Sequence, residues 1–330
     1  MVSKSRKGQI EVPLNWFYVI IVGGFVIFLF ARIGVSNAHN AQQQNAAELT
    51  KFFDTAIETY AQTSNTMGNS GLPILSFTIN NTQDGVSVVH YQNKDYNLKE
   101  TVFSASSLKG NISFWTYPFQ TGYESSKLLF LTDDKEYYYL YAGNSQDNLY
   151  TALQKELPSG YSNYFNIVPT ISDPRTKQNS VVACINLAST TNTGSCRIII
   201  KSDASNTETG TITFPHDNKK YHYYNYGMIF AALFSSNAAD FENGMKTAIL
   251  RHNVTGQVLI ERAGVLKSKV DSGNGEQILC PSEYDQAITD IKSFQNLNLT
   301  SNENPTIITK IPEVNNINRQ LFNIGCWRIY

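Results

Sequence analysis

Two histidines and an aspartate lie close together in the sequence and could bind a metal ion. His216, Asp217 and His222 fall within residues 214–226. Imidazole and carboxylate groups ligate zinc when a loop folds them together. The spacing argues against that chemistry, because a helix would put the two histidines on different faces and a strand would hold them about 20 Å apart. A polar turn is the better interpretation, and we expect no metal site and no cofactor.

Two groups of tyrosines are candidates for a binding surface. Alternate positions of a strand point to one face, so Tyr137, Tyr139 and Tyr141 would form a platform. Tyr224 and Tyr226 would form a second one. Exposed platforms of this kind stack on sugars or contact a protein partner. The alternative is that these tyrosines fill the core with their hydroxyls at its margin. We favour this alternative, because tyrosine side chains are often partly buried in folded proteins.

Four cysteines lie in the second half of the chain, and an even number in an exported domain predicts two disulfides. Cys184 and Cys196 flank a turn-like stretch between two strand-like runs, so we pair them across a hairpin. Cys280 and Cys326 then remain, and their bridge would tie the C-terminal tail to the late helices. Reduced, buried cysteines are the alternative.

An uncharged apolar run over residues 14–31 predicts a transmembrane helix. About 18 helical residues span roughly 27 Å, close to the thickness of a hydrocarbon core. Lys4, Arg6 and Lys7 precede the run, so the positive-inside rule puts residues 1–13 in the cytoplasm. We therefore predict a retained signal anchor in the cell membrane, a single pass through the lipid, and an extracellular C-terminal domain.

Residues 32–70 predict an amphipathic helix that continues the anchor. Its apolar stripe has helical spacing and consists of Leu49, Phe52, Phe53, Ala56, Ile57 and Tyr60. We expect this stripe to pack on the extracytoplasmic domain or on neighbouring subunits.

The opening of the chain resembles two archaeal groups. Lys7-Gly8-Gln9 is similar to the processing site of class III prepilins, and this resemblance implies cleavage between Gly8 and Gln9. Glu11 stands earlier than the prepilin pattern has its glutamate, the serine of the pattern is missing, and Pro13 interrupts the segment. The whole opening more closely resembles uncharacterised archaeal single-span membrane proteins, as does the aromatic tail after a cysteine at residues 326–330.

Composition excludes some classes of function. The 330 residues carry a formal net charge of −1, with 16% charged and 12% aromatic residues. A nucleic-acid binder would show a basic face and a high pI, so nucleic acid is excluded as a partner. No phosphate-binding glycine loop, nucleophile elbow, zinc-protease motif or calcium-binding loop occurs in the sequence, which predicts no catalytic residues and no enzyme activity.

The order of expected elements predicts an α+β domain over residues 71–330. Residues 71–215 are β-rich, with antiparallel hairpins expected for 74–79 with 86–91 and for 127–131 with 137–141, and a helix for 147–156. Residues 216–330 are mostly helical, with separate helices expected after Ser236 and over 254–270. Strands followed by helices without regular alternation are typical of the α+β class.

These features favour a structural, adhesive or pilin-like protein with its domain held outside the membrane. Such a protein would self-assemble or bind a surface protein or glycan. The alternative function is a membrane-tethered ligand-binding domain for a glycan or a protein, with the tyrosine-rich segments lining a groove.

Overall fold

A computed structural model of the chain describes part of its length. The described residues are 22–28, 30–32, 44, 51 and 67–330, except 85, 92–93, 99, 105–106, 134–136, 143–146, 159, 161–164, 168–179, 187–195, 204–205, 272–279, 296 and 301–304. The chain divides into two compact units, Met1–Phe52 and Phe53–Tyr330. In the first unit, residues 22–28 and 30–32 are helical.

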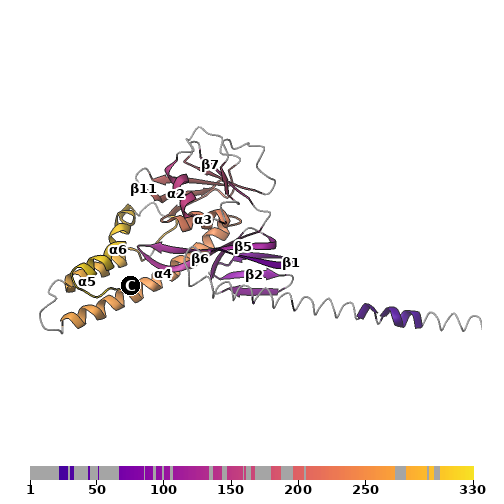
Figure 1. The fold of residues 1–330 in the computed structure, drawn as a ribbon, viewed down its shortest axis with the longest axis horizontal. Helices are drawn as coiled ribbons and strands as arrows, with labels where there is room; N and C mark the ends of the chain where they lie inside the picture. Colours follow the sequence, from indigo (N-terminus) through magenta and orange to yellow (C-terminus); the bar gives the residue numbers. More distant parts are fainter. Residues whose placement is uncertain are drawn as a thin grey trace, which may run out of the picture. The chain divides into compact units, whose positions relative to one another are not determined.

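The second unit is an α+β domain with two mixed six-stranded sheets (Figure 1). The first sheet has the order β3-β2-β1-β5-β6-β4, and the second has the order β12-β11-β10-β9-β7-β8. The strands are β1 (Met67–Asn81), β2 (Ser87–Tyr91), β3 (Lys94–Leu98), β4 (Thr101–Ser104), β5 (Leu108–Thr121), β6 (Tyr123–Asp133), β7 (Tyr138–Ala142), β8 (Phe165–Ile167), β9 (Val181–Ile185), β10 (Ile198–Asp203), β11 (Asn206–Phe214) and β12 (Lys219–Tyr223). The helices are α2 (Asn148–Glu156), α3 (Tyr226–Phe234), α4 (Ala238–Asp271), α5 (Cys280–Ser293) and α6 (Pro305–Asn323).

The predicted transmembrane helix over residues 14–31 is wrong. Among the described residues, no helix is both long enough and apolar enough to cross a membrane. This finding also corrects the predicted single-pass location in the cell membrane. Residues 1–21 lie outside the described residues.

Several other predictions fall wholly or partly on residues that are not described. The processing site at Gly8 and Gln9 and the cytoplasmic segment 1–13 lie outside the described residues. The same holds for the apolar stripe of the amphipathic helix predicted over 32–70. At its far end the structure differs from that prediction, because β1 begins at Met67.

α3 lies between the two sheets and joins them into one core (Figure 1). It contacts β5 and β6 of the first sheet and β10 to β12 of the second. Every residue from Gly227 to Phe234 is buried, which explains why this helix is apolar on all sides. The Asn225 side chain starts the helix by accepting a hydrogen bond from the Met228 amide at 3.0 Å, and its Nδ2 donates to the carbonyl of Gln120 in β5.

The first predicted hairpin is confirmed, because β1 pairs antiparallel with β2. The second is wrong, because β6 and β7 belong to different sheets. β6 pairs with β5 and β4, and its residues 128–133 are buried without interruption. A continuous apolar run is typical of a strand covered on both faces, whereas a hairpin with one solvated face alternates. The antiparallel hairpin expected around Cys184 and Cys196 is also wrong, since β9 and β10 pair parallel.

α4 is one helix of 34 residues where two were expected. It runs through Gly256, which lies against the first residue of β6. A Cβ at this position would stand 2.2 Å from the Tyr123 hydroxyl oxygen. The Tyr123 hydroxyl donates a hydrogen bond to the His252 carbonyl at 3.1 Å. The glycine therefore allows the strand to approach the helix closely and does not end the helix.

Candidate functional site

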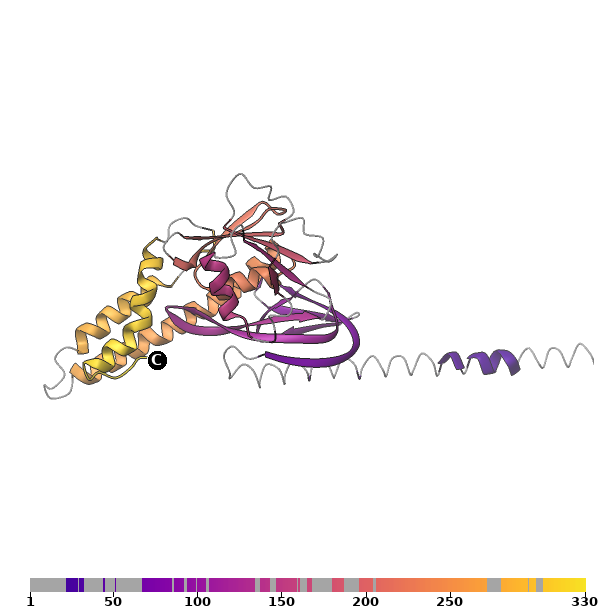
Figure 2. The same cartoon turned by 45° about the horizontal axis from the view of Figure 1, so that its top comes forward.

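The C-terminal part of α4 packs against α5, and α5 packs against α6 (Figure 2). We call residues 246–271 of α4, α5, α6 and residues 324–330 the helical arm. The inner faces of its three helices contribute fully buried or nearly buried apolar side chains: Leu259, Ala263, Tyr284, Ala287, Ile291, Val314, Ile317 and Leu321. Lys267 of α4 also forms an ion pair with Asp285 of α5, with Nζ 2.6 Å from the carboxylate. The arm therefore has a core of its own, continuous with the core of the sheets.

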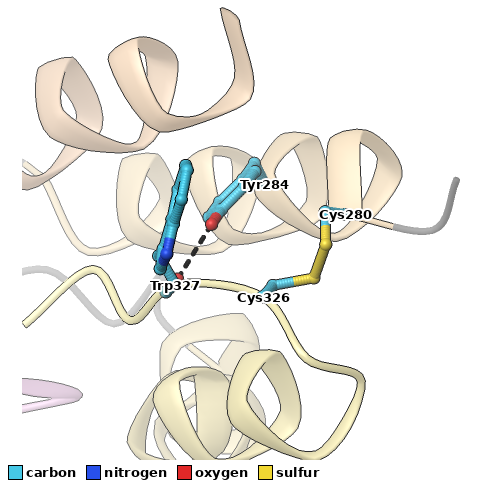
Figure 3. The surroundings of a disulfide bond; sticks show 4 residues. All are labelled: Cys280, Tyr284, Cys326 and Trp327. Atoms are coloured by element: carbon cyan, nitrogen blue, oxygen red, sulfur yellow. Dashed lines mark hydrogen bonds between the residues drawn. A yellow bond between two sulfur atoms is a disulfide. The ribbon is translucent and has the colours of Figure 1, made fainter. Parts of the chain in front are cut away.

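A disulfide between Cys280 and Cys326 joins the start of α5 to the segment after α6 (Figure 3). Beside it, the Tyr284 hydroxyl donates a hydrogen bond to the Trp327 carbonyl at 2.9 Å. The last residues are held as well, because the Asn318 side-chain oxygen accepts a hydrogen bond from the Ile329 amide at 2.7 Å. These contacts fix the tail on α5 and α6.

The second disulfide links Cys184 to Cys196 within the second sheet. Both half-cystines are fully buried, and Tyr141 packs against them. The two disulfides join the same pairs of cysteines that the sequence spacing favours. At the Cys184–Cys196 bridge, the neighbouring strands β9 and β10 pair parallel, whereas an antiparallel hairpin was predicted.

The outer face of α4 carries an exposed apolar row. Its members are Leu250, Val254, Val258 and Val265, which are 63%, 60%, 56% and 53% exposed. Spacings of four, four and seven residues put them on one face of the helix. Four more large apolar side chains are exposed on the arm: Phe322, Ile324, Trp327 and Tyr330. Outside residues 22–30, the described part of the chain exposes its large apolar side chains on this arm alone.

Two opposite charges flank the row along one edge. At 100° per residue, Lys246, Gln257 and Glu261 fall on the same side of α4, with Lys246 before the row and Glu261 within its second half. Lys246 forms an ion pair with Glu242 one turn away, at 2.7 Å. The Glu261 carboxylate accepts a hydrogen bond from the side-chain amide of Gln257, with Nε2 3.1 Å from Oε1. Arg251 lies on the opposite edge of the row, about 20° around the helix from Val258, and its charge is paired with Glu100.

The predicted tyrosine platforms occupy mostly covered positions. Tyr139 is 4% exposed and Tyr224 is 3% exposed, so neither presents its ring to solvent. The Tyr224 hydroxyl donates a hydrogen bond to the Asn298 carbonyl at 2.9 Å. The other three tyrosines are partly covered: Tyr137, Tyr141 and Tyr226. This arrangement is the one in which tyrosines line the core and place their hydroxyls at its margin.

The residues considered for zinc lie on the hairpin of β11 and β12, and they occupy different parts of it. His216 and Asp217 are in the turn between β11 and β12, while His222 is within β12. The Asp217 carboxylate accepts a hydrogen bond from the Ala238 amide at the start of α4, at 2.9 Å. In the part of the chain that the structure describes, no three His, Cys, Asp or Glu side chains gather as metal ligands.

Sequence reasoning missed the apolar row because it cannot tell which apolar side chains of a helix meet the core. Leu250, Val258 and Val265 have the same spacing signals as buried Leu259. The signal was an excess of apolar positions, since an apolar residue every two or three positions along 249–266 is more than one core-facing stripe requires.

Comparison with known proteins returned no match to a protein-family model, to a curated protein or to a solved structure.

Proposed function

We propose that this is a structural or adhesive protein without a catalytic role, and that it self-associates through the apolar row of α4. The observation that carries the proposal is the gathering of exposed large apolar side chains on the helical arm. Exposed, contiguous apolar surface rimmed by polar residues is typical of protein–protein contact sites. Both disulfides support a protein that works in an oxidising environment, where such bonds persist.

The chemistry of the row favours a second copy of the chain as the occupant. In a two-fold dimer the same patch meets itself, so charges near its centre would repel each other. Leu250, Val254 and Val258 form a centre without charge, which suits such a contact. Burial of these side chains against their copies then supplies the attraction, at about 25 cal/mol per Å² of apolar surface.

The flanking charges favour an antiparallel arrangement of the two α4 helices. When two identical helices pack antiparallel, the same edge of each faces the other across the two-fold axis. Lys246 and Glu261 lie on one edge at opposite sides of Val254. Pairing centred near Val254 therefore places Lys246 of each copy beside Glu261 of the other, which gives two reciprocal ion pairs. A parallel arrangement would instead bring opposite edges of the two helices together, so Lys246 and Glu261 of the two copies would not meet.

Substitution of Val254 by glutamate tests this function. Val254 is 60% exposed, so the fold tolerates the change, whereas the two-fold contact would bury two carboxylates near its axis. We expect the dissociation constant of the dimer to rise about a hundredfold or more, equivalent to about 3 kcal/mol. Sedimentation velocity of the full chain over a concentration series measures the change.

Gln154→Glu is the matched control, because it adds the same charge to an exposed helical position on α2, outside the arm. We expect this variant to associate as the parent does. A parent chain that stays monomeric over the whole concentration series would refute the proposal, and so would a Val254→Glu variant that associates unchanged.

A further inference from the structure

A polar cleft lies where α4 crosses the beginnings of β4 and β6. Its volume is about 510 Å³, which falls within the usual range of small-molecule sites, roughly 300–1,000 Å³. Two acids, two bases and two hydroxyl side chains line it: Glu100, Glu124, Ser125, Ser126, Lys127 and Arg251. β4 and β6 run parallel with Thr101 opposite Leu128, so Glu100 and Lys127 meet across the two strands.

Buried side-chain polar atoms without a hydrogen-bond partner lie in or next to the residues that line this cleft. Within the described part of the chain, buried side-chain nitrogen and oxygen atoms without a hydrogen-bond partner occur on three residues, Thr101, Ser126 and His252. Ser126 lines the cleft itself, and the other two directly follow the lining residues Glu100 and Arg251. Buried polar groups are nearly always paired, so an orphan group needs an explanation. A ligand in the cleft would supply one for Ser126, which is among the residues that line it.

The lining specifies the charge of the ligand. Arg251 forms an ion pair with Glu100, with Nη1 3.2 Å from Oε2, and Lys127 adds a second cation. The Glu124 side chain is exposed, and its carboxylate makes no hydrogen bond or ion pair with another described residue. We propose that the cleft binds a small zwitterion of the α-amino acid class. Arg251 and Lys127 hold its carboxylate, Glu124 accepts from its ammonium group, and the Ser126 hydroxyl bonds to the carboxylate.

Other small ligands fit the lining less well. The lining charges sum to zero, so a simple anion would leave Glu124 facing a like charge, and a simple cation would face Lys127 and Arg251. A sugar site is generally built with an aromatic ring for stacking, and none of the described residues that line this cleft is aromatic. This proposal concerns a different surface from the apolar row of α4 and does not depend on self-association.

Isothermal titration calorimetry of the full chain against each of the twenty amino acids tests the proposal. Acetate and methylamine serve as probes that carry one of the two charges alone. We expect at least one amino acid to bind with a dissociation constant below about 10 mM. We expect acetate and methylamine to bind at least about tenfold more weakly than that amino acid, because each loses one charge-assisted contact.

Glu124→Gln and Ser126→Ala assign the contacts. Each removes one polar partner of the ligand, and we expect each to weaken binding of that amino acid about tenfold or more. Glu208→Gln is the matched control for Glu124→Gln, because it neutralises an exposed carboxylate on β11, outside the cleft and the arm, and it should leave binding unchanged. Absence of binding by all twenty amino acids would overturn the proposal. Equal binding of acetate, or full affinity in Glu124→Gln, would overturn it as well.

Discussion

We expect the protein to lose stability as the pH falls from 7 to 5, because His252 is buried in its neutral form. This histidine is fully buried, and neither ring nitrogen has a hydrogen-bond partner among the described residues. Its ring stacks on Tyr123, with centroids 4.1 Å apart and planes at 4°. Phe119 contacts the same ring edge-on at 5.8 Å. Burial lowers the pKa of His252 from 6.5 to about 3, because an imidazolium would lose its hydration in this apolar setting.

The sign of the effect follows from this lowered pKa. Between pH 6.5 and pH 3 the unfolded chain binds a proton at His252 that the folded chain does not bind. Stability contributed by the neutral ring is therefore complete above pH 6.5 and declines as the pH falls towards 3. The slope is about 1.4 kcal/mol per pH unit, so the decrease between pH 7 and pH 5 is about 2 kcal/mol.

Urea unfolding of the parent chain and of His252→Phe at both pH values isolates this contribution. Phenylalanine keeps the stacking on Tyr123 and has no titrating group. We expect the parent to lose about 2 kcal/mol more than the variant between pH 7 and pH 5, since all other titrating groups are common to both. Parallel losses in the two proteins would show that His252 does not carry the effect.

Removal of the Cys280–Cys326 disulfide should lower stability more than removal of the other bridge. The first bridge spans a sequence separation of 46 residues and the second spans 12. Loop-closure entropy of the unfolded chain gives about 4 kcal/mol for the longer loop and about 3 kcal/mol for the shorter one. The longer loop contains α5 and α6, and opening its disulfide removes the covalent link between α5 and residues 324–330.

Double serine variants measure these contributions. We expect the Cys280→Ser/Cys326→Ser chain to unfold at lower urea than the Cys184→Ser/Cys196→Ser chain, and both below the parent. Hydrogen exchange adds a local measurement, because the amide of Ile329 should lose protection in the first variant and keep it in the second. An unchanged urea midpoint in Cys280→Ser/Cys326→Ser would contradict the prediction.

Local signals predicted several elements well. Asp147 starts α2, its carboxylate accepting a hydrogen bond from the Tyr150 amide at 3.1 Å, and this capping signal is visible in the sequence. The pairing of β1 with β2 also follows from local information, since a polar turn separates two apolar runs. Each of these elements depends on contacts between residues no more than 12 positions apart in the sequence.

Partner choice between distant segments could not be predicted in the same way. β6 has a short polar connection to β7, yet it pairs with β4 and β5 because its apolar residues on both faces need cover from both sides. The mixed character of both sheets follows from such long-range choices. The candidate site has the same origin, since Leu250 is exposed while β4, β6 and α5 pack on other parts of α4.

Charge reversal at the edge of the apolar row is the most direct test of the proposed self-association. Glu261→Lys would place lysines at positions 246 and 261 of opposite copies beside each other twice, and we expect the dimer to weaken about tenfold or more. Adding Lys246→Glu restores two opposite-charge pairs, so the double variant should associate within about threefold of the parent. Sedimentation velocity that shows this loss and recovery supports antiparallel pairing of α4. A double variant as weak as Glu261→Lys, or a single variant as strong as the parent, would contradict it.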